Sequence, residues 1–210
     1  EMCIRDSSYS DQNAVNRIMD ATLNQTLPPH SSRISFVLVR PSHPGNIGAA
    51  ARAIKTMGFT DLRVVAPVDP EYRTHPDAVA FSTSSVDVLT DSRDYPTLEE
   101  ALSDVALPFA MTGYSRRFGP ALETMRESAD RASLWAEENK GPGIAFVFGC
   151  ERSGLTNEEV GLCRFATAIP ANPLSQSLNL AQAVQIAAYE MHMALLQRAH
   201  AAGLLSLIHI

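Results

Sequence analysis

Five short, largely apolar runs recur along this chain, and each is followed by a turn containing polar residues, proline or glycine. They are residues 34–39, 62–66, 107–111, 144–148 and 165–169. Apolar runs of this length are typical of strands buried on both faces of a parallel sheet. The first two flank a helical pattern, which predicts a right-handed βαβ unit. We therefore expect an α/β fold in which helices flank a parallel sheet.

Helical patterns separate these runs. A helix is predicted over residues 46–58, with Asn46 as its N-cap and a glycine at its end. A long helix is predicted over about residues 180–196, because apolar residues recur there every three or four positions, with Ser177 or Asn179 as its cap. Two S/T-x-x-E capping boxes mark further helix starts: Thr97 with Glu100, and Thr156 with Glu159.

The remaining segments carry weaker patterns. The acidic stretch 67–96 predicts only a short helix near residues 78–81 and a strand at 86–89. Residues 1–31 are predicted to form a disordered or loosely packed N-terminal arm, and residues 32–200 the folded domain. Residues 201–210 are predicted to be a C-terminal tail. The first residues and the tail fit no cap or periodic pattern, which suggests that they are non-native additions.

Composition narrows the class of protein. No apolar run approaches the length of a membrane span, and the three cysteines lack paired spacing, so we expect a soluble protein of the reducing cytoplasm. The histidines are too scattered to predict a metal site. The net charge of −6 disfavours non-specific nucleic-acid binding. Five basic residues nevertheless cluster early in the chain, either as a phosphate-binding face or as a composition bias: Arg33, Arg40, Arg52, Lys55 and Arg63.

Polar loops follow three of the predicted strands, at residues 112–117, 149–154 and 170–179. A fourth strand end, after Val39, leads to Asn46 and Arg52. In open α/β sheets, ligands bind outside the carboxyl ends of the strands. These loops are therefore predicted to form one ligand site. Dinucleotide, nucleoside-triphosphate and serine-hydrolase loop motifs are absent from the sequence.

Each of these features also has an ordinary structural explanation. Arg52 on a short helix is most often part of a solvated face. Glu151 can be the acidic residue of a turn, and residues 177–179 can be a simple helix cap. What favours a functional interpretation is the combination of the segments rather than any one of them.

That combination resembles the SpoU-type RNA ribose 2′-O-methyltransferases of the SPOUT superfamily. Three segments carry the resemblance, and any one alone is weak. They are Asn46-Ile47-Gly48-Ala49-Ala50-Ala51-Arg52, Phe148-Gly149-Cys150-Glu151-Arg152-Ser153-Gly154-Leu155-Thr156, and Ile169-Pro170 with Ser177-Leu178-Asn179-Leu180-Ala181-Gln182-Ala183-Val184. Within that family, residues 171–173, 182–185 and 189–190 look most like the bacterial branch that methylates cytidine or uridine at position 32 of the tRNA anticodon loop.

The resemblance implies a C-terminal trefoil knot, a homodimer, and S-adenosylmethionine bound in the knotted loops. It assigns cofactor binding to Thr112, Gly113, Tyr114, Gly149, Glu151, Ile169, Gln176, Ser177 and Leu178. It assigns catalysis to Asn46, Arg52, Glu151, Ser177 and Asn179, and RNA contacts to Arg52, Arg116 and Arg117.

The chemistry suits these residue types. Arg52 is expected to hold the target phosphate and polarise the ribose hydroxyl, since guanidinium stays protonated and is not a simple base. Glu151 is expected to orient Arg52 or Asn46 by a charge-assisted hydrogen bond. Two alternatives stay open: methylation of another tRNA or ribosomal RNA nucleotide, and a catalytically idle RNA-binding module of the same fold.

Overall fold

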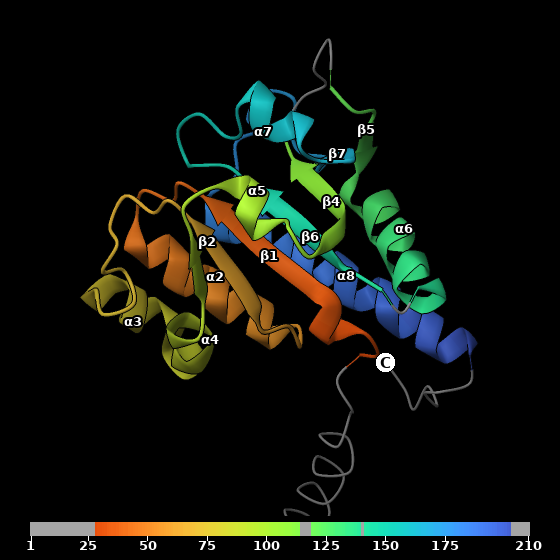
Figure 1. The fold of residues 1–210 in the computed structure, drawn as a ribbon, viewed down its shortest axis with the longest axis horizontal. Coiled ribbons are helices and arrows are strands. Elements are labelled where there is room, and N and C mark those ends of the chain that lie inside the picture. The colour runs from red at the N-terminus through yellow and green to blue at the C-terminus, as the bar shows by residue number, and fades with distance from the viewer. Residues whose placement is uncertain (1–27, 114–118, 140, 203–210) are drawn as a thin grey trace, which may run out of the picture.

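A single parallel sheet forms the centre of the protein in the computed structural model, which describes residues 28–113, 119–139 and 141–202 (Figure 1). Its described strands are β1 (Ile34–Val39), β2 (Asp61–Val65), β3 (Arg93–Tyr95), β4 (Val105–Met111), β5 (Leu122–Thr124), β6 (Gly143–Phe148) and β7 (Phe165–Ala168). They lie in the order β3-β2-β1-β6-β4-β7-β5, and every neighbouring pair is parallel. This confirms the predicted fold class.

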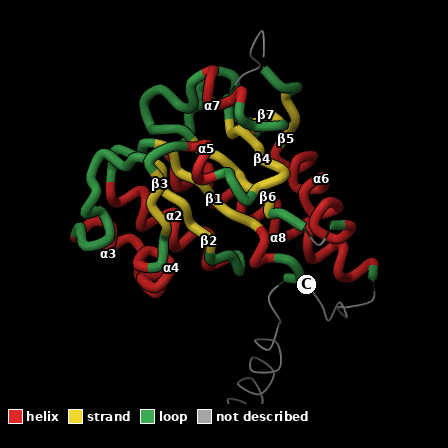
Figure 2. The backbone as a smooth tube through the Cα atoms, viewed as in Figure 1, coloured by secondary structure: helices red, strands yellow, loops and turns green. Residues whose placement is uncertain are grey.

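Helices cover both faces of the sheet, and Figure 2 shows the strands gathered in the centre with helical segments around them. The described helices are η1 (Ser31–Arg33), α2 (Pro44–Thr56), α3 (Pro76–Ser82), η2 (Thr83–Ser85), α4 (Val86–Thr90), α5 (Leu98–Ala101), α6 (Met125–Glu138), α7 (Asn157–Gly161) and α8 (Leu180–Ala201). Residues of α2, α3, α4, α6 and α8 share the larger apolar core, whereas α5 and the residues around α7 belong to the smaller one.

The two cores follow from the alternation of side chains along a strand. In β1, Phe36 and Leu38 belong to the larger core, whereas Val37 and Val39 belong to the smaller one. All six residues of this strand are buried. Its near-continuous apolar sequence is therefore the consequence of being covered on both faces.

The predicted capping signals are largely confirmed. Thr97 accepts a hydrogen bond from the backbone of Glu100, and Thr156 and Glu159 form a reciprocal capping box. Asn179 caps α8 in the same way with Gln182, which decides between the two predicted caps. Helix α8 runs five residues further than the predicted end at residue 196, to Ala201.

Two local predictions were wrong. Asn46 does not cap α2, because His43 accepts the capping hydrogen bond from Gly45 and Pro44 occupies the first helical position. Proline is favoured at that position because its φ is already helical and it lacks the N–H that would stay unpaired. The predicted strand at residues 86–89 is instead helix α4, whose Val88 and Leu89 are buried in the larger core. Packing there overrides the strand preference of β-branched residues.

Helix α6 was not predicted, although its start carries a capping box of Thr124 and Glu127.

Three predicted site residues, Tyr114, Arg116 and Arg117, lie outside the described residues, as do residues 1–27 and 203–210. The predicted arm, tail and knot therefore stay predictions. None of the described helices combines the length and apolar character needed to cross a bilayer.

Candidate functional site

A cavity of about 370 Å³ lies where the loops after β4, β6 and β7 meet. Its size is within the range of small-molecule sites in proteins. Three separate segments line it: Met111 to Gly113, Gly149 to Leu155, and a group from the last part of the chain consisting of Thr167, Ile169, Gln176, Ser177, Leu178, Leu180 and Ala183. The predicted convergence of the three strand-end loops is therefore confirmed.

Glycine allows two backbone segments to touch beside this cavity. A Cβ atom on Gly149 would lie 2.0 Å from the carbonyl carbon of Gly154 and 2.2 Å from the nitrogen of Leu155. Such contacts are impossible, so only glycine fits at residue 149. Gly154 itself has a φ of 66°, in the left-handed region that glycine adopts without strain. The loop after β6 is thus folded tightly back on itself.

A chain of side-chain hydrogen bonds joins the three segments that carry the family resemblance. The amide nitrogen of Asn46 donates to Glu151 at 2.8 Å, and the amide nitrogen of Asn179 donates to the amide oxygen of Asn46 at 3.0 Å. The amide oxygen of Asn179 accepts from the backbone nitrogen of Ala181 at 2.9 Å. The first turn of α2, the loop after β6 and the start of α8 are therefore held together at one place.

Glu151 is the negative centre of this chain. Its second carboxylate oxygen accepts from the backbone nitrogen and the hydroxyl of Ser42, at 2.9 and 2.8 Å, and the backbone nitrogen of His43 lies 3.3 Å from the first. Partial burial by itself raises the pKa of this carboxyl group, but the hydrogen bonds from Asn46 and Ser42 outweigh burial and lower the pKa. Glu151 is therefore held as a carboxylate.

The predicted cofactor residues lie together. Within the described part of the chain, every one of them lines the cavity: Thr112, Gly113, Gly149, Glu151, Ile169, Gln176, Ser177 and Leu178. Of the predicted catalytic residues, Glu151 and Ser177 line it, while Asn46 and Asn179 join its rim through hydrogen bonds. The predicted orientation of Asn46 by Glu151 is present in the structure.

Arg52 is placed differently. It is exposed on α2 and does not line the cavity, and its guanidinium has no hydrogen bond or ion pair with any other described residue. No contact joins it to Glu151, so only the Asn46 branch of the predicted orientation occurs. The role of Arg52 stays a prediction.

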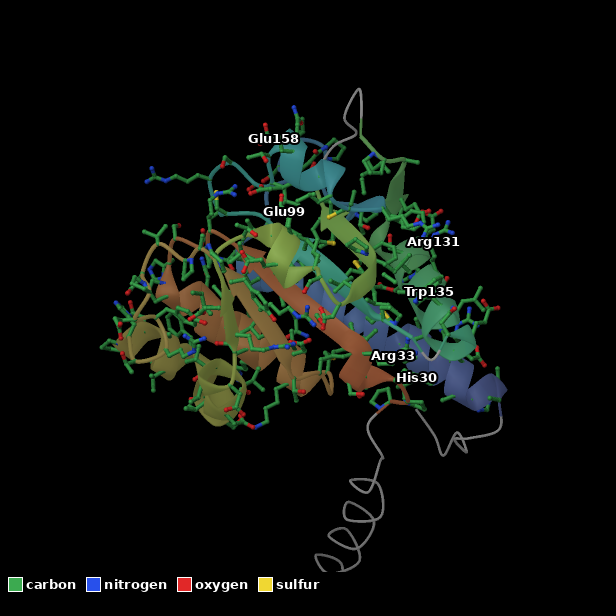
Figure 3. The ribbon with its side chains drawn as sticks, in the orientation of Figure 1. His30, Arg33, Glu99, Arg131, Trp135 and Glu158 are labelled. Atoms are coloured by element: carbon green, nitrogen blue, oxygen red, sulfur yellow. The ribbon has the colours of Figure 1, made fainter. Side chains whose placement is uncertain are left out.

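The other basic residues of the early cluster serve internal contacts. Arg33 donates to carbonyl oxygens in the last turn of α6 and in the loop after it, and Figure 3 shows Arg33 at the opposite end of the molecule from Glu158 on α7. The remaining three form ion pairs: Arg40 with Glu159, Lys55 with Asp87, and Arg63 with Asp61 and Asp104. These four residues do not present one free basic face.

Several residues of the site were not predicted. Ser42 and His43, which bind Glu151, are among them, as are Thr167 and Ala183 in the cavity wall, whereas Arg152, Ser153 and Gly154 belong to the predicted loop 149–154. For Ser42 and His43 the available signal was their place in the turn between the buried strand β1 and helix α2, at the carboxyl end of the strand. No group of three or more His, Cys, Asp or Glu side chains suited to a metal ion occurs within residues 28–113, 119–139 and 141–202.

Comparison with known proteins gives close relatives. The tRNA (cytidine/uridine/adenosine-2′-O-)-methyltransferase TrmJ of Pseudomonas aeruginosa is 46% identical over 162 residues, covering 77% of this chain and 61% of that protein. The tRNA (cytidine/uridine-2′-O-)-methyltransferase TrmJ of Yersinia enterocolitica is 44% identical over 171 residues, covering 81% of this chain and 64% of that protein. The chain thus spans less than two thirds of the length of these relatives.

Solved structures of methyltransferases are similar to this chain as well. A probable methyltransferase from Bordetella pertussis matches with a TM-score of 0.75 and 47% identity, covering 79% of this chain and 98% of that one. TrmJ from Z. mobilis matches with a TM-score of 0.69 and 39% identity, covering 75% and 67%. The sequence profile of the SpoU rRNA Methylase family matches residues 33–189, which include all three segments joined by hydrogen bonds. This chain therefore belongs to the SpoU rRNA methylase family.

Proposed function

We propose that this protein uses S-adenosylmethionine to methylate the 2′-hydroxyl of a ribose in the anticodon loop of tRNA. The observation that carries the proposal is the hydrogen-bonded chain from Glu151 through Asn46 to Asn179 at the rim of the cavity. It joins the three segments of the family resemblance in one place. The names of the tRNA methyltransferases that this chain resembles supply the substrate class.

The cavity suits the proposed cofactor. Its wall combines apolar side chains, among them Ile169 and Leu178, with the backbone of three loops. Backbone N–H and C=O groups can bind an adenine edge and an amino-acid moiety without charged side chains. When bound, S-adenosylmethionine supplies a methyl group on a positively charged sulfur. Gly149 and Gly113 are expected to lie against it, with Ser177 on the opposite loop.

The residues of the site then have distinct tasks. Both oxygens of Glu151 already accept hydrogen bonds, so we assign it a positioning role rather than that of the proton acceptor. Glu151 accepts a hydrogen bond from the side-chain amide of Asn46, and the amide oxygen of Asn46 accepts one from Asn179 at the start of α8. Arg52 is free to bind an RNA phosphate and to polarise the attacking hydroxyl. Alignment of the reacting atoms is the main contribution expected from such a site.

We assign the target to cytidine or uridine at position 32. A second candidate is position 34, because a structure concerned with the 2-OH methylation of C/U34 on tRNA matches with a TM-score of 0.62 and 25% identity. Both positions belong to the anticodon loop, where unpaired bases can be splayed out and read singly.

A homodimer working in the cytoplasm completes the proposal. Helix α8 is apolar around much of its circumference, and Tyr189 on it is 48% exposed. A helix of this kind is usually covered on all sides. Light scattering on the purified protein is expected to give twice the mass of the chain.

The function is tested by incubating the protein with tRNA and labelled S-adenosylmethionine, followed by mapping of the modified ribose. We expect one 2′-O-methyl group at position 32. A label at position 34 would favour the second candidate. Binding of S-adenosylmethionine without transfer to any RNA would favour an idle binding module and contradict the proposal.

A further inference from the structure

Phe81 is an aromatic side chain that the proposed function leaves unexplained. It lies on α3 and is 52% exposed, although phenylalanine is usually buried. Among the described residues it takes part in none of the ring-to-ring contacts that join the buried phenylalanines. The ring is therefore not part of the cluster of stacked phenylalanines in the core.

The ring lies against the first turn of α2. A Cβ atom on Gly45 would be 2.8 Å from both Cδ2 and Cε2 of Phe81, so glycine is needed for the ring to come this close. His43 lies beside the same glycine, with its Nδ1 accepting from Gly45 at 3.1 Å. The next residue along the helix is Asn46, whose amide binds Glu151. Phe81 thus touches the same helix start that enters the hydrogen-bonded chain.

Arg52 shares the side of α2 on which α3 packs. Gly45, Gly48 and Arg52 are spaced i, i+3 and i+7, which places them along one face of a helix. A Cβ on Gly48 would lie 2.0 Å from the carbonyl oxygen of Ala78, so α3 covers this face at Gly48 as well as at Gly45. An exposed aromatic ring and an exposed guanidinium that pairs with no other described side chain therefore lie on the same side of the helix that carries Asn46.

We propose that Phe81 is a stacking platform for an unpaired base next to the methylated nucleotide. The inference rests on the proposed function and names one of its RNA contacts. Bases splayed out of RNA loops stack on aromatic side chains, and every base offers a face for stacking. Stacking needs no positive charge, which suits a helix that also carries Asp77. Phe81 holds the neighbouring base while Arg52 binds the phosphate.

The test compares Phe81→Ala, Phe81→Leu and Phe81→Trp with wild type, and Val79→Ala is the matched control. Val79 is 40% exposed on the same helix, so its truncation removes apolar surface without removing a ring. Affinity for an anticodon stem-loop RNA, KM and kcat for tRNA, affinity for S-adenosylmethionine and thermal midpoint are measured. Phe81→Ala and Phe81→Leu are expected to weaken RNA binding and raise KM about tenfold.

Phe81→Trp is expected to retain or improve RNA affinity, because indole is also a stacking surface. Affinity for S-adenosylmethionine is expected to stay unchanged in all variants, and Val79→Ala is expected to behave as wild type. An RNA with an abasic site at the stacked position is expected to bind wild type and Phe81→Ala equally. The affinities of wild type and Phe81→Ala for the intact and the abasic RNA together form a double-mutant cycle, which isolates the contact between Phe81 and the stacked base.

Three results would overturn the inference. If wild type is active and Phe81→Ala has the same RNA affinity and the same KM, Phe81 does not contact the RNA, and the proposed function is unaffected. A drop in the mass of Phe81→Ala on light scattering would place the ring in a subunit interface instead. Absence of methyl transfer and of RNA binding by wild type would remove the proposed function as well, which distinguishes the two failures.

Discussion

The side-chain amide of Asn179 donates a 3.0 Å hydrogen bond to the side-chain oxygen of Asn46, across 133 residues of sequence. Asn179 is also the N-cap of α8, and Asn46 in turn donates to Glu151. Two helix starts and one strand-end loop are therefore coupled through three side chains. Because residues in one hydrogen-bond network act together, their substitutions should not be additive.

Removal of the central amide should disconnect this network. Asn46→Ala is expected to lower methyl transfer about a hundredfold and stability by about 1 to 3 kcal/mol, because Glu151 loses a donor while half-buried. Asn46→Asp should be worse, since it sets a second carboxylate against Glu151. Transfer rates and urea unfolding measure both effects. Wild-type rates in both variants would show that the network is only structural.

The exposed guanidinium of Arg52 should matter for catalysis and not for folding. Arg52→Ala is expected to cost about 3 kcal/mol of transition-state stabilisation, roughly a hundredfold in rate, with an unchanged unfolding midpoint. Arg164→Ala is the matched control. Arg164 is also exposed, but it lies just before β7, whereas the cavity lies at the carboxyl end of that strand. Single-turnover methylation of tRNA compares the two. Equal activity of the two variants would end the assignment of Arg52.

Glu151 should make stability depend on pH. Its pKa is lowered from the ordinary value of 4.5, so it stabilises the folded chain above that value and loses this contribution as the pH falls through the lower, folded pKa. Glu151→Gln is expected to show a smaller loss of urea resistance between neutral and acidic pH than wild type. Glu158→Gln, which alters an exposed carboxylate on α7, should match wild type. Parallel pH curves for wild type and Glu151→Gln would contradict the assignment.

Gly149 should tolerate no side chain. Gly149→Ala is expected to lower stability by about 1 to 3 kcal/mol and to abolish cofactor binding, because its Cβ would meet the Gly154 backbone at 2.0 Å. Gly161→Ala is the control, since a Cβ there meets no atom within 4 Å and alanine favours the helix. Calorimetric titration with S-adenosylmethionine and thermal unfolding distinguish them. Normal binding by Gly149→Ala would show that the loop can move aside.

Arg63 should be structural. It is 3% exposed and pairs with Asp61 and Asp104, so Arg63→Met is expected to cost about 1 to 3 kcal/mol, because both carboxylates lose hydrogen bonds while Asp61 keeps those from Ser35 and Arg93. Arg93→Met removes an exposed arginine from the same Asp61 and is expected to cost about 1 kcal/mol or less. Urea unfolding measures both. Similar losses of unfolding free energy in Arg63→Met and Arg93→Met would show that the burial of Arg63 does not determine how much its ion pairs stabilise the fold.

Much of the fold was predictable because its signals are local. The apolar run of β1 predicted a strand covered on both faces, and the capping boxes at Thr97 and Thr156 predicted helix starts. The strand predicted at residues 86–89 failed because a short apolar run suits either structure, and packing against the larger core selected the helix. Helix α6 was missed although its capping box at Thr124 was visible in the sequence.

The sequence by itself determined the parallel sheet, the helix starts at Thr97 and Thr156, and which loops end at the ligand-binding edge. Only the tertiary structure decided which residues contact each other: that Glu151 binds Asn46, that Arg63 is buried while Arg52 pairs with no other described side chain, and that Phe81 covers Gly45. The reason is physical. Periodicity and caps depend on neighbours within a few residues, whereas these pairings depend on which segments the sheet order brings together.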